Sequence, residues 1–187
     1  MTRENQTIAG GSSLSFPRPP RSFTDKEGRA IEIRADEFPQ EALVKMYGDF
    51  ASEDRAQGLP PTTEERIREW LAILEEGLNV IAWHVDTETA GCSAGQTGLE
   101  RAIGHAVLLD CGDGTHELTI FVHHEYQLAG IGSRLVRTLL GYGQDHGVER
   151  VWLTVQRSNH VAMNLYRSVG FETINESGVE HEMELDL

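Results

Sequence analysis

The chain has 187 residues, of which 25% are charged and 39% hydrophobic, so one well-cored globular domain is expected. Acidic residues outnumber basic ones by 30 to 16, giving a formal net charge of −14, and such a surface repels nucleic-acid phosphates. No run of about 18 or more apolar residues occurs, so no membrane helix is predicted.

The N-terminal sequence MTRENQTIAGGSS lacks the apolar core of a signal peptide, so we expect a cytoplasmic protein. The two cysteines, Cys92 and Cys111, match neither a disulfide framework nor a metal-ligand pattern and are interpreted as free thiols. Lysine occurs only at Lys26 and Lys45. An acidic, lysine-poor composition is also typical of proteins adapted to high salt, in which dense carboxylates keep the surface hydrated.

Residues 1–28 contain proline- and glycine-rich sequence without an apolar period, and they are predicted to form a flexible tail. Residues 29–187 are predicted to form one domain. Its first strand is expected at Ile31 and Ile33, which alternate with charged residues.

Two helices are expected next. Pro39 stands at the start of the first, and a capping box of Thr62 and Glu65 begins the second, which Gly77 ends. Three consecutive strands then follow, and after them come helix, strand, helix and two closing strands. This order predicts an α/β (α+β) fold with a mixed, mostly antiparallel central sheet of about six to seven strands and helices on both faces.

The stretch Thr115–Gly132 joins a predicted buried strand to a helix through a short loop that contains Gly130 and Gly132. A strand, glycine loop and helix start leave several backbone N–H groups unpaired and pointing outward. The helix dipole then favours an anion in front of them. We therefore predict a pyrophosphate site, with an ordinary tight strand-to-helix turn as the alternative.

The element order and two motifs resemble the GNAT superfamily of acyl-CoA-dependent N-acyltransferases, over roughly residues 29–187. The family's Q/R-x-x-G-x-G/A loop is matched by Gln127, Gly130 and Gly132. Its second motif is an Asn followed by a helix that ends in Tyr-x-x-x-Gly-Phe. That motif is matched by Asn159, Ala162, Tyr166, Gly170 and Phe171.

The resemblance implies acetyl-CoA as co-substrate and direct transfer of its acetyl group to a primary amine in a ternary complex. It implies that the coenzyme contacts lie at Ile120, Phe121 and Val122 for the pantetheine arm, at Gln127, Leu128, Ala129, Gly130, Ile131, Gly132 and Ser133 for the pyrophosphate, and at Asn159. Tyr166 would protonate the leaving thiolate, and a core tyrosine is the alternative interpretation. No metal is predicted, because a thioester is already activated.

The general base has two principal candidates. Glu117 lies five residues before Val122, as in the acetyltransferase domain of bacterial protein-lysine acetyltransferases, which this stretch resembles. Many other members place an acid six residues before that valine, where this chain has His116. Neighbours on a strand point to opposite faces, so only one of the two should face the cleft. His123 and His124 are further candidates, although we expect them to flank the loop at the surface.

Arg55 and Trp70 fall where family members build the acceptor pocket, and a surface arginine and a core tryptophan are the alternative interpretation. The acceptor stays open between protein lysine and a small amine, and a homodimer is one option for the oligomeric state. Neither motif contains a cysteine, which argues against a covalent acyl-enzyme. Two competing classes are a non-catalytic acyl-CoA-binding or sensor module and a structural domain that binds a partner.

Overall fold

The computed structural model describes residues 15–35, 37–51, 55, 59–86, 100–112 and 114–187. Within them, eight strands form one sheet in the order β1-β2-β3-β4-β5-β6-β8-β7. The strands are β1 (Arg21–Thr24), β2 (Ala30–Arg34), β3 (Leu78–Val85), β4 (Glu100–Asp110), β5 (Thr115–Val122), β6 (Arg150–Gln156), β7 (Glu172–Ser177) and β8 (Glu180–Asp186). The helices are α1 (Gln40–Gly48), α2 (Glu64–Leu74), the 3₁₀ helix η3 (His124–Tyr126), α3 (Ile131–Asp145) and α4 (His160–Val169).

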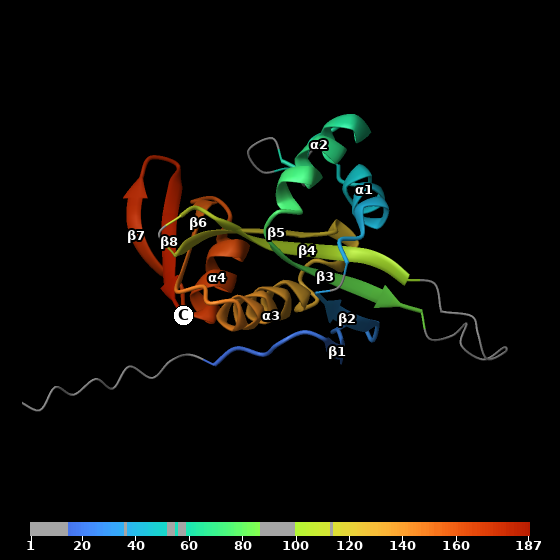
Figure 1. The fold of residues 1–187 in the computed structure, drawn as a ribbon, viewed down its shortest axis with the longest axis horizontal. Helices are drawn as coiled ribbons and strands as arrows, with labels where there is room; N and C mark the ends of the chain where they lie inside the picture. Colours follow the sequence, from blue (N-terminus) through green and yellow to red (C-terminus); the bar gives the residue numbers. More distant parts are fainter. Residues whose placement is uncertain (1–14, 36, 52–54, 56–58, 87–99, 113) are drawn as a thin grey trace, which may run out of the picture.

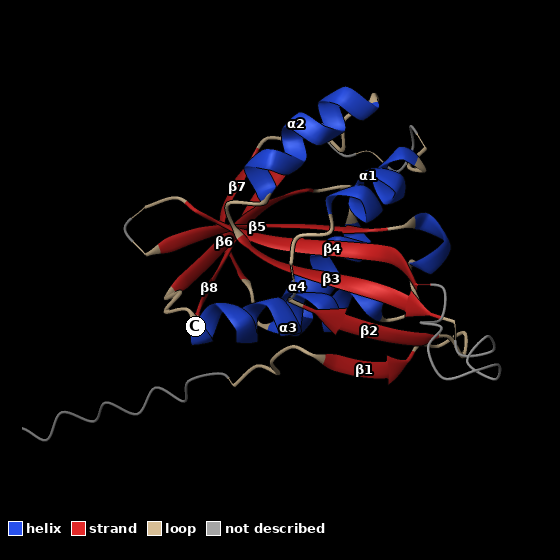
Figure 2. Ribbon diagram, turned by 45° about the vertical axis from the view of Figure 1, so that its right-hand side comes forward, coloured by secondary structure: helices blue, strands red, loops and turns tan. Residues whose placement is uncertain are grey.

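All neighbouring strands pair antiparallel except β5 and β6, which are parallel. The predicted mixed, mostly antiparallel sheet is therefore confirmed. The strand count is eight rather than six or seven, because β1 adds an edge strand beside β2. Helices α1 and α2 lie on one face of the sheet, while α3 and α4 lie on the other (Figures 1 and 2).

The N-terminal segment differs from the expected tail up to residue 28. Strand β1 pairs with β2, with Phe23 opposite Ile31. Upstream of β1, Phe16 is only 3% exposed and belongs to the core on the α3 face. Gly141 of α3 makes this contact possible, because a Cβ there would overlap the carbonyl oxygen of Pro17. Residues 15–28 are thus held against the sheet and α3.

The alternation of β5 side chains divides the core in two. Leu118, Ile120 and Val122 belong to the cluster built with α3 and α4, whereas Phe121 packs into the cluster built with α1 and α2. Alternate residues of a strand point to opposite faces. Glu117 therefore shares the α1–α2 face with Phe121.

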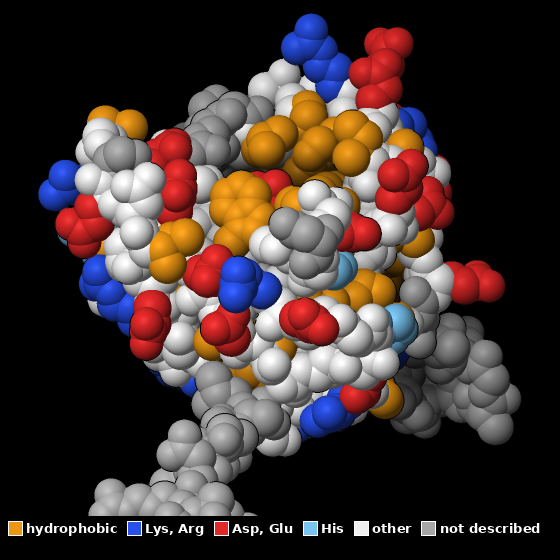
Figure 3. All heavy atoms as spheres, turned by 60° about the vertical axis from the view of Figure 1, so that its left-hand side comes forward, with side chains coloured by type: hydrophobic (Ala, Val, Ile, Leu, Met, Phe, Trp, Pro, Cys, Tyr) orange, Lys and Arg blue, Asp and Glu red, His pale blue; other side chains and the backbone are white. Residues whose placement is uncertain are grey.

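The face of the molecule drawn in Figure 3 carries charges of both signs. On the face drawn in Figure 3, acidic side chains are scattered among basic and apolar ones. The net charge of −14 therefore does not collect into a single acidic patch on that face. No helix of the described part of the chain has the length and apolar character to cross a membrane. Cys111 is an exposed free thiol, and Cys92 lies outside the described residues.

Candidate active site

Strands β5 and β6 pair over only three positions, and the last pair joins Glu117 to Trp152. A cavity of about 720 Å³ adjoins the separated parts of the strands, lined by Leu118 to Val122 of β5 and by Thr154 to Gln156 of β6. Separated strands leave backbone N–H and C=O groups that an extended ligand can pair with. The geometry therefore suits a long, narrow ligand lying between the strands.

The glycine loop forms one end of this cavity. Leu128 and Gly130 both have left-handed backbone conformations, with φ of 60° and 84°. Gly130 precedes α3 and offers no side-chain cap to its first turn. The first N–H groups of a helix have no intrahelical acceptor, so those of α3 are free to bind an anion. Gln127 closes the loop by donating from Nε2 to the carbonyl oxygen of Val122 at 3.1 Å.

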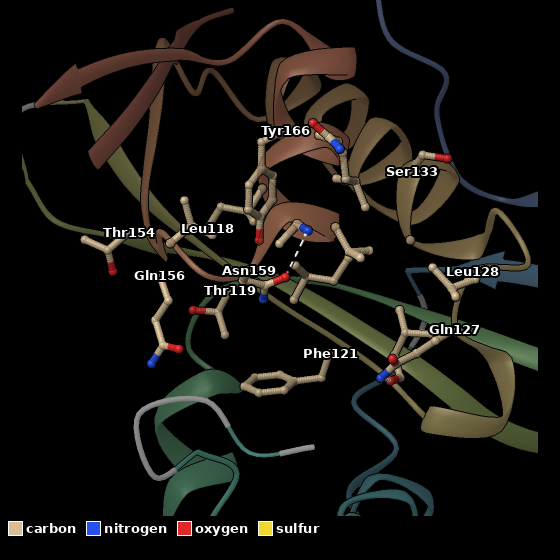
Figure 4. A pocket seen from close by; sticks show the side chains of 18 of the residues that line it. Leu118, Thr119, Phe121, Gln127, Leu128, Ser133, Thr154, Gln156, Asn159 and Tyr166 are labelled. Carbon is tan, nitrogen blue, oxygen red and sulfur yellow. Dashed lines mark hydrogen bonds between the residues drawn. The ribbon is translucent and has the colours of Figure 1, made fainter. Parts of the chain in front are cut away.

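Tyr166 of α4 and Asn159, the residue just before α4, line the cavity (Figure 4). The Asn159 side chain also caps the helix, since its Oδ1 accepts a hydrogen bond from the Ala162 N–H at 3.1 Å. Tyr166 is 7% exposed, and its ring packs against Phe171 at a centroid distance of 5.7 Å. Its phenol points from α4 into the cavity. Tyr166 is thus both a core residue and a lining residue.

Burial raises the pKa of the Tyr166 phenol well above its ordinary value, because the charged phenolate would lose solvation. The hydroxyl therefore keeps its proton throughout the neutral and mildly alkaline range. A protonated phenol inside the cavity can serve as a proton donor.

The structure places Glu117, and not His116, among the residues that line the cavity. The imidazole of His116 faces the other side of β5, where its Nδ1 is buried without a hydrogen-bond partner among the described residues. His123 is 1% exposed, so the expectation of a surface residue is wrong for it. Its Nε2 lies 2.9 Å from Nη2 of Arg101. Neither His123 nor His124 lines the cavity.

Arg55 and Trp70 lie outside the cavity lining. The guanidinium of Arg55 donates to the carbonyl oxygens of Phe50, Pro60 and Pro61, so it holds the loop that leads to α2. The indole of Trp70 packs edge-on against Phe121 at 5.4 Å. Because Phe121 lines the cavity, Trp70 shapes the cavity wall indirectly.

Several lining residues were not singled out from the sequence: Lys26, Leu59, Thr119, Thr154 and Gln156. Thr119 could have been found from strand alternation, since it lies two residues from both Glu117 and Phe121. Lys26 and Leu59 carried no such signal, because they reach the site through long-range packing. Among the described residues, no group of three or more His, Cys, Asp or Glu side chains is arranged to hold a metal ion.

The fold is that of GNAT acetyltransferases. The GNAT domain of S. lividans PAT superposes with a TM-score of 0.68 and 14% identity, over 90% of this chain and 97% of that chain. The paiA N-acetyltransferase of Thermoplasma acidophilum, solved in complex with coenzyme A, superposes with a TM-score of 0.62 and 19% identity. This match covers 84% of this chain and 99% of that chain. At these identities the likeness establishes the fold alone.

The sequence establishes the family. The model of the Acetyltransferase (GNAT) family matches residues 41–171, and the chain belongs to that family. It is similar to the N-alpha-acetyltransferase RimI of Mycobacterium tuberculosis, with 48% identity over 56 residues, which are 30% of this chain and 34% of that protein. The matches to curated relatives span between 23% and 42% of those proteins' own lengths.

Proposed function

We propose that the protein transfers an acetyl group from acetyl-CoA to a primary amine by direct attack in a ternary complex. The observation that carries this proposal is the cavity beyond the Glu117–Trp152 pair, which also reaches the glycine loop and the phenol of Tyr166. The pyrophosphate would bind the N–H groups from Gln127 to Ser133. The pantetheine arm would pair with the backbone of β5 from Ile120 to Val122.

Two side chains would move protons. The carboxylate of Glu117 takes a proton from the acceptor ammonium, directly or through a water, and the amine lone pair attacks the thioester carbonyl carbon. The tetrahedral adduct loses its second nitrogen proton to solvent, and the C–S bond breaks as the carbonyl re-forms. Tyr166 donates its proton to the departing thiolate and regains one from solvent, while Glu117 releases its proton to solvent. The products are an amide and the free coenzyme thiol, and no acyl-enzyme forms.

The acceptor is proposed to be a protein amine or a small amine. The RimI relative is named as an N-alpha-acetyltransferase, and a relative from Haemophilus ducreyi as a ribosomal protein bS18-alanine N-acetyltransferase. Because the likeness to these proteins is partial, an α-amine is one acceptor class to test beside the lysine ε-amine.

In the experiment, the protein is incubated with isotope-labelled acetyl-CoA and one of three acceptors. The acceptors are a peptide with N-terminal alanine, an N-terminally blocked peptide with one lysine, and a polyamine. Mass spectrometry then locates any labelled acetyl group. A labelled amide on one acceptor class supports the proposal and names the class. Coenzyme binding without label on any amine would instead favour an acyl-CoA sensor.

A further inference from the structure

The turn between β1 and β2 brings Lys26 to the glycine loop. Its backbone N–H donates to the carbonyl oxygen of Ala129 at 3.3 Å, and its Nζ donates to that of Leu128 at 3.4 Å. The side chain lines the same cavity as Gln127 and Gly130. Its stem passes close to Gly130, where the ideal Cβ position lies 3.7 Å from Cε of Lys26, an ordinary van der Waals distance. Lys26 therefore touches the loop and the cavity together.

The hydrogen bonds of the loop are arranged to favour an anion. Its carbonyl oxygens at Leu128 and Ala129 accept from Lys26, and that of Gly130 accepts from Ser133 Oγ and Arg134 Nη1, both at 3.2 Å. The partial negative charges of the loop are thus engaged by donors. The N–H groups at the start of α3 remain available for an anion.

The cation of Lys26 is available for a ligand as well. Elsewhere on the molecule, basic side chains pair with carboxylates, as Arg34 does with Glu100 at 2.7 Å and Arg68 with Glu41 at 2.6 Å. In the part of the chain that the structure describes, Lys26 makes no ion pair; its Nζ contacts only a carbonyl oxygen. On a protein of net charge −14, an anionic coenzyme needs local positive charge to offset the general repulsion.

We propose that Lys26 binds a phosphate group of the coenzyme and makes the site select the phosphorylated donor over an uncharged pantetheine thioester. This inference rests on the proposed function, because it assumes that acetyl-CoA occupies the cavity. Lys26 lies outside residues 41–171, which the family model matches. The proposed contact would come from the N-terminal segment, through the turn between β1 and β2.

The test compares Lys26→Gln with Lys45→Gln, since these are the two lysines of the chain. Lys45 is an exposed residue of α1 and does not line the cavity, so its variant controls for the loss of one charge. Calorimetric titration measures the affinity for CoA and for dephospho-CoA. Steady-state kinetics measure the KM for acetyl-CoA and for acetyl-pantetheine, which carries no phosphate.

We expect Lys26→Gln to weaken CoA binding about tenfold, as for a lost charge-assisted hydrogen bond, and to leave the KM for acetyl-pantetheine unchanged. The salt dependence of CoA binding should flatten, and Lys26→Arg should restore most of the affinity. Lys45→Gln should behave as wild type. A tenfold loss that disappears with dephospho-CoA would assign the contact to the 3′-phosphate, and one that persists would assign it to the pyrophosphate.

Unchanged CoA affinity in Lys26→Gln would overturn the inference while leaving the proposed function intact. An equal loss toward acetyl-pantetheine would overturn it too, because it would show that Lys26 acts only by holding the loop in shape. If the wild-type protein binds no CoA, the proposed function itself fails.

Discussion

Glu117 and Trp152 form the last of the three parallel pairs between β5 and β6. The position of this pair explains the arrangement of the site, because the cavity is lined by the strand residues that follow it. Glu117 stands at the closed end of the separation, and the glycine loop stands at the other end of β5. The carboxylate and the anion-binding loop are therefore held by one rigid strand.

Replacing Glu117 by Gln should lower kcat by roughly 100-fold or more, since general base catalysis contributes that much or more. CoA affinity should stay unchanged, because Glu117 is expected to contact the acceptor and not the coenzyme phosphates. The matched control is His116→Gln, whose side chain faces away from the cavity and should leave kcat near wild type. Equal losses in both variants would contradict the assignment of the base.

Replacing Tyr166 by Phe should lower kcat with little change in the affinity for CoA, because the ring and its packing against Phe171 are retained. Burial raises the pKa of this phenol, so it stays protonated as the pH rises through the assay range. Any fall in wild-type activity between pH 8 and about 10 should therefore persist in the variant. An alkaline fall that vanishes in Tyr166→Phe would show that the phenol itself titrates in this range.

The buried imidazole of His105 is predicted to make the stability of the fold sensitive to acid. Asn79 donates from Nδ2 to the carbonyl oxygens of Leu74 and Gly77, so its Oδ1 is left to accept from Nε2 of His105 at 2.7 Å. The other ring nitrogen, Nδ1, then accepts from the Tyr47 hydroxyl at 2.8 Å. The imidazole is thus neutral and fully engaged, and burial lowers its pKa from 6.5 to about 3.

Because the unfolded chain binds a proton at His105 below about pH 6.5 and the folded chain does not until about pH 3, acid should destabilise the fold. The contribution of His105 to the free energy of unfolding should be fully present above about pH 6.5. It should fall by about 1.4 kcal/mol for each pH unit below that. Urea unfolding at pH 7, 6 and 5 measures the slope. The slope of unfolding free energy against pH reports the number of protons taken up on unfolding, and in His105→Asn this number should be lower by about one. An unchanged slope would rule out His105 as its source. Should that variant not fold, the wild-type His105 ring resonance should show no titration between pH 5 and 8.

Gly141→Ala should destabilise the protein by about 1 to 3 kcal/mol, the usual cost of overpacking a filled site. The added Cβ would overlap backbone atoms of Pro17, so the N-terminal segment must move away from α3. Faster proteolysis at Arg18 and Arg21 would report that release. Gly48→Ala is the control, because nothing lies within 4 Å of its added Cβ. Unchanged proteolysis in Gly141→Ala would show that the segment is not held by this contact.

The parts of the fold with local signals were predictable from the sequence. The apolar stripe of α3, the cap at Asn159 and the strand of Glu117 all depend on spacing or on a neighbouring residue, and each appears where it was expected. The period of two along β5 predicted that only one of His116 and Glu117 faces the cleft, and the structure was needed to show that Glu117 lines the cavity.

The remaining parts depend on contacts between distant segments. Strand β1 is short and forms only by pairing with β2, while Phe16 is buried only because a glycine of α3 admits it. His123 is buried because Arg101 and the η3 turn surround it. Lys26 reaches the glycine loop by the same long-range packing. No repeating spacing of residues in the sequence predicts any of these contacts.

The most direct test of the account measures thiol release from acetyl-CoA beside CoA binding, in wild type and Glu117→Gln, with the best acceptor from the amine panel. We predict that both proteins bind CoA equally and that only the wild type releases thiol rapidly with formation of one acetylated amine per thiol. Equal thiol release by the two proteins, or binding by wild type with no amine acetylated, would contradict direct transfer at the Glu117 end of the cavity.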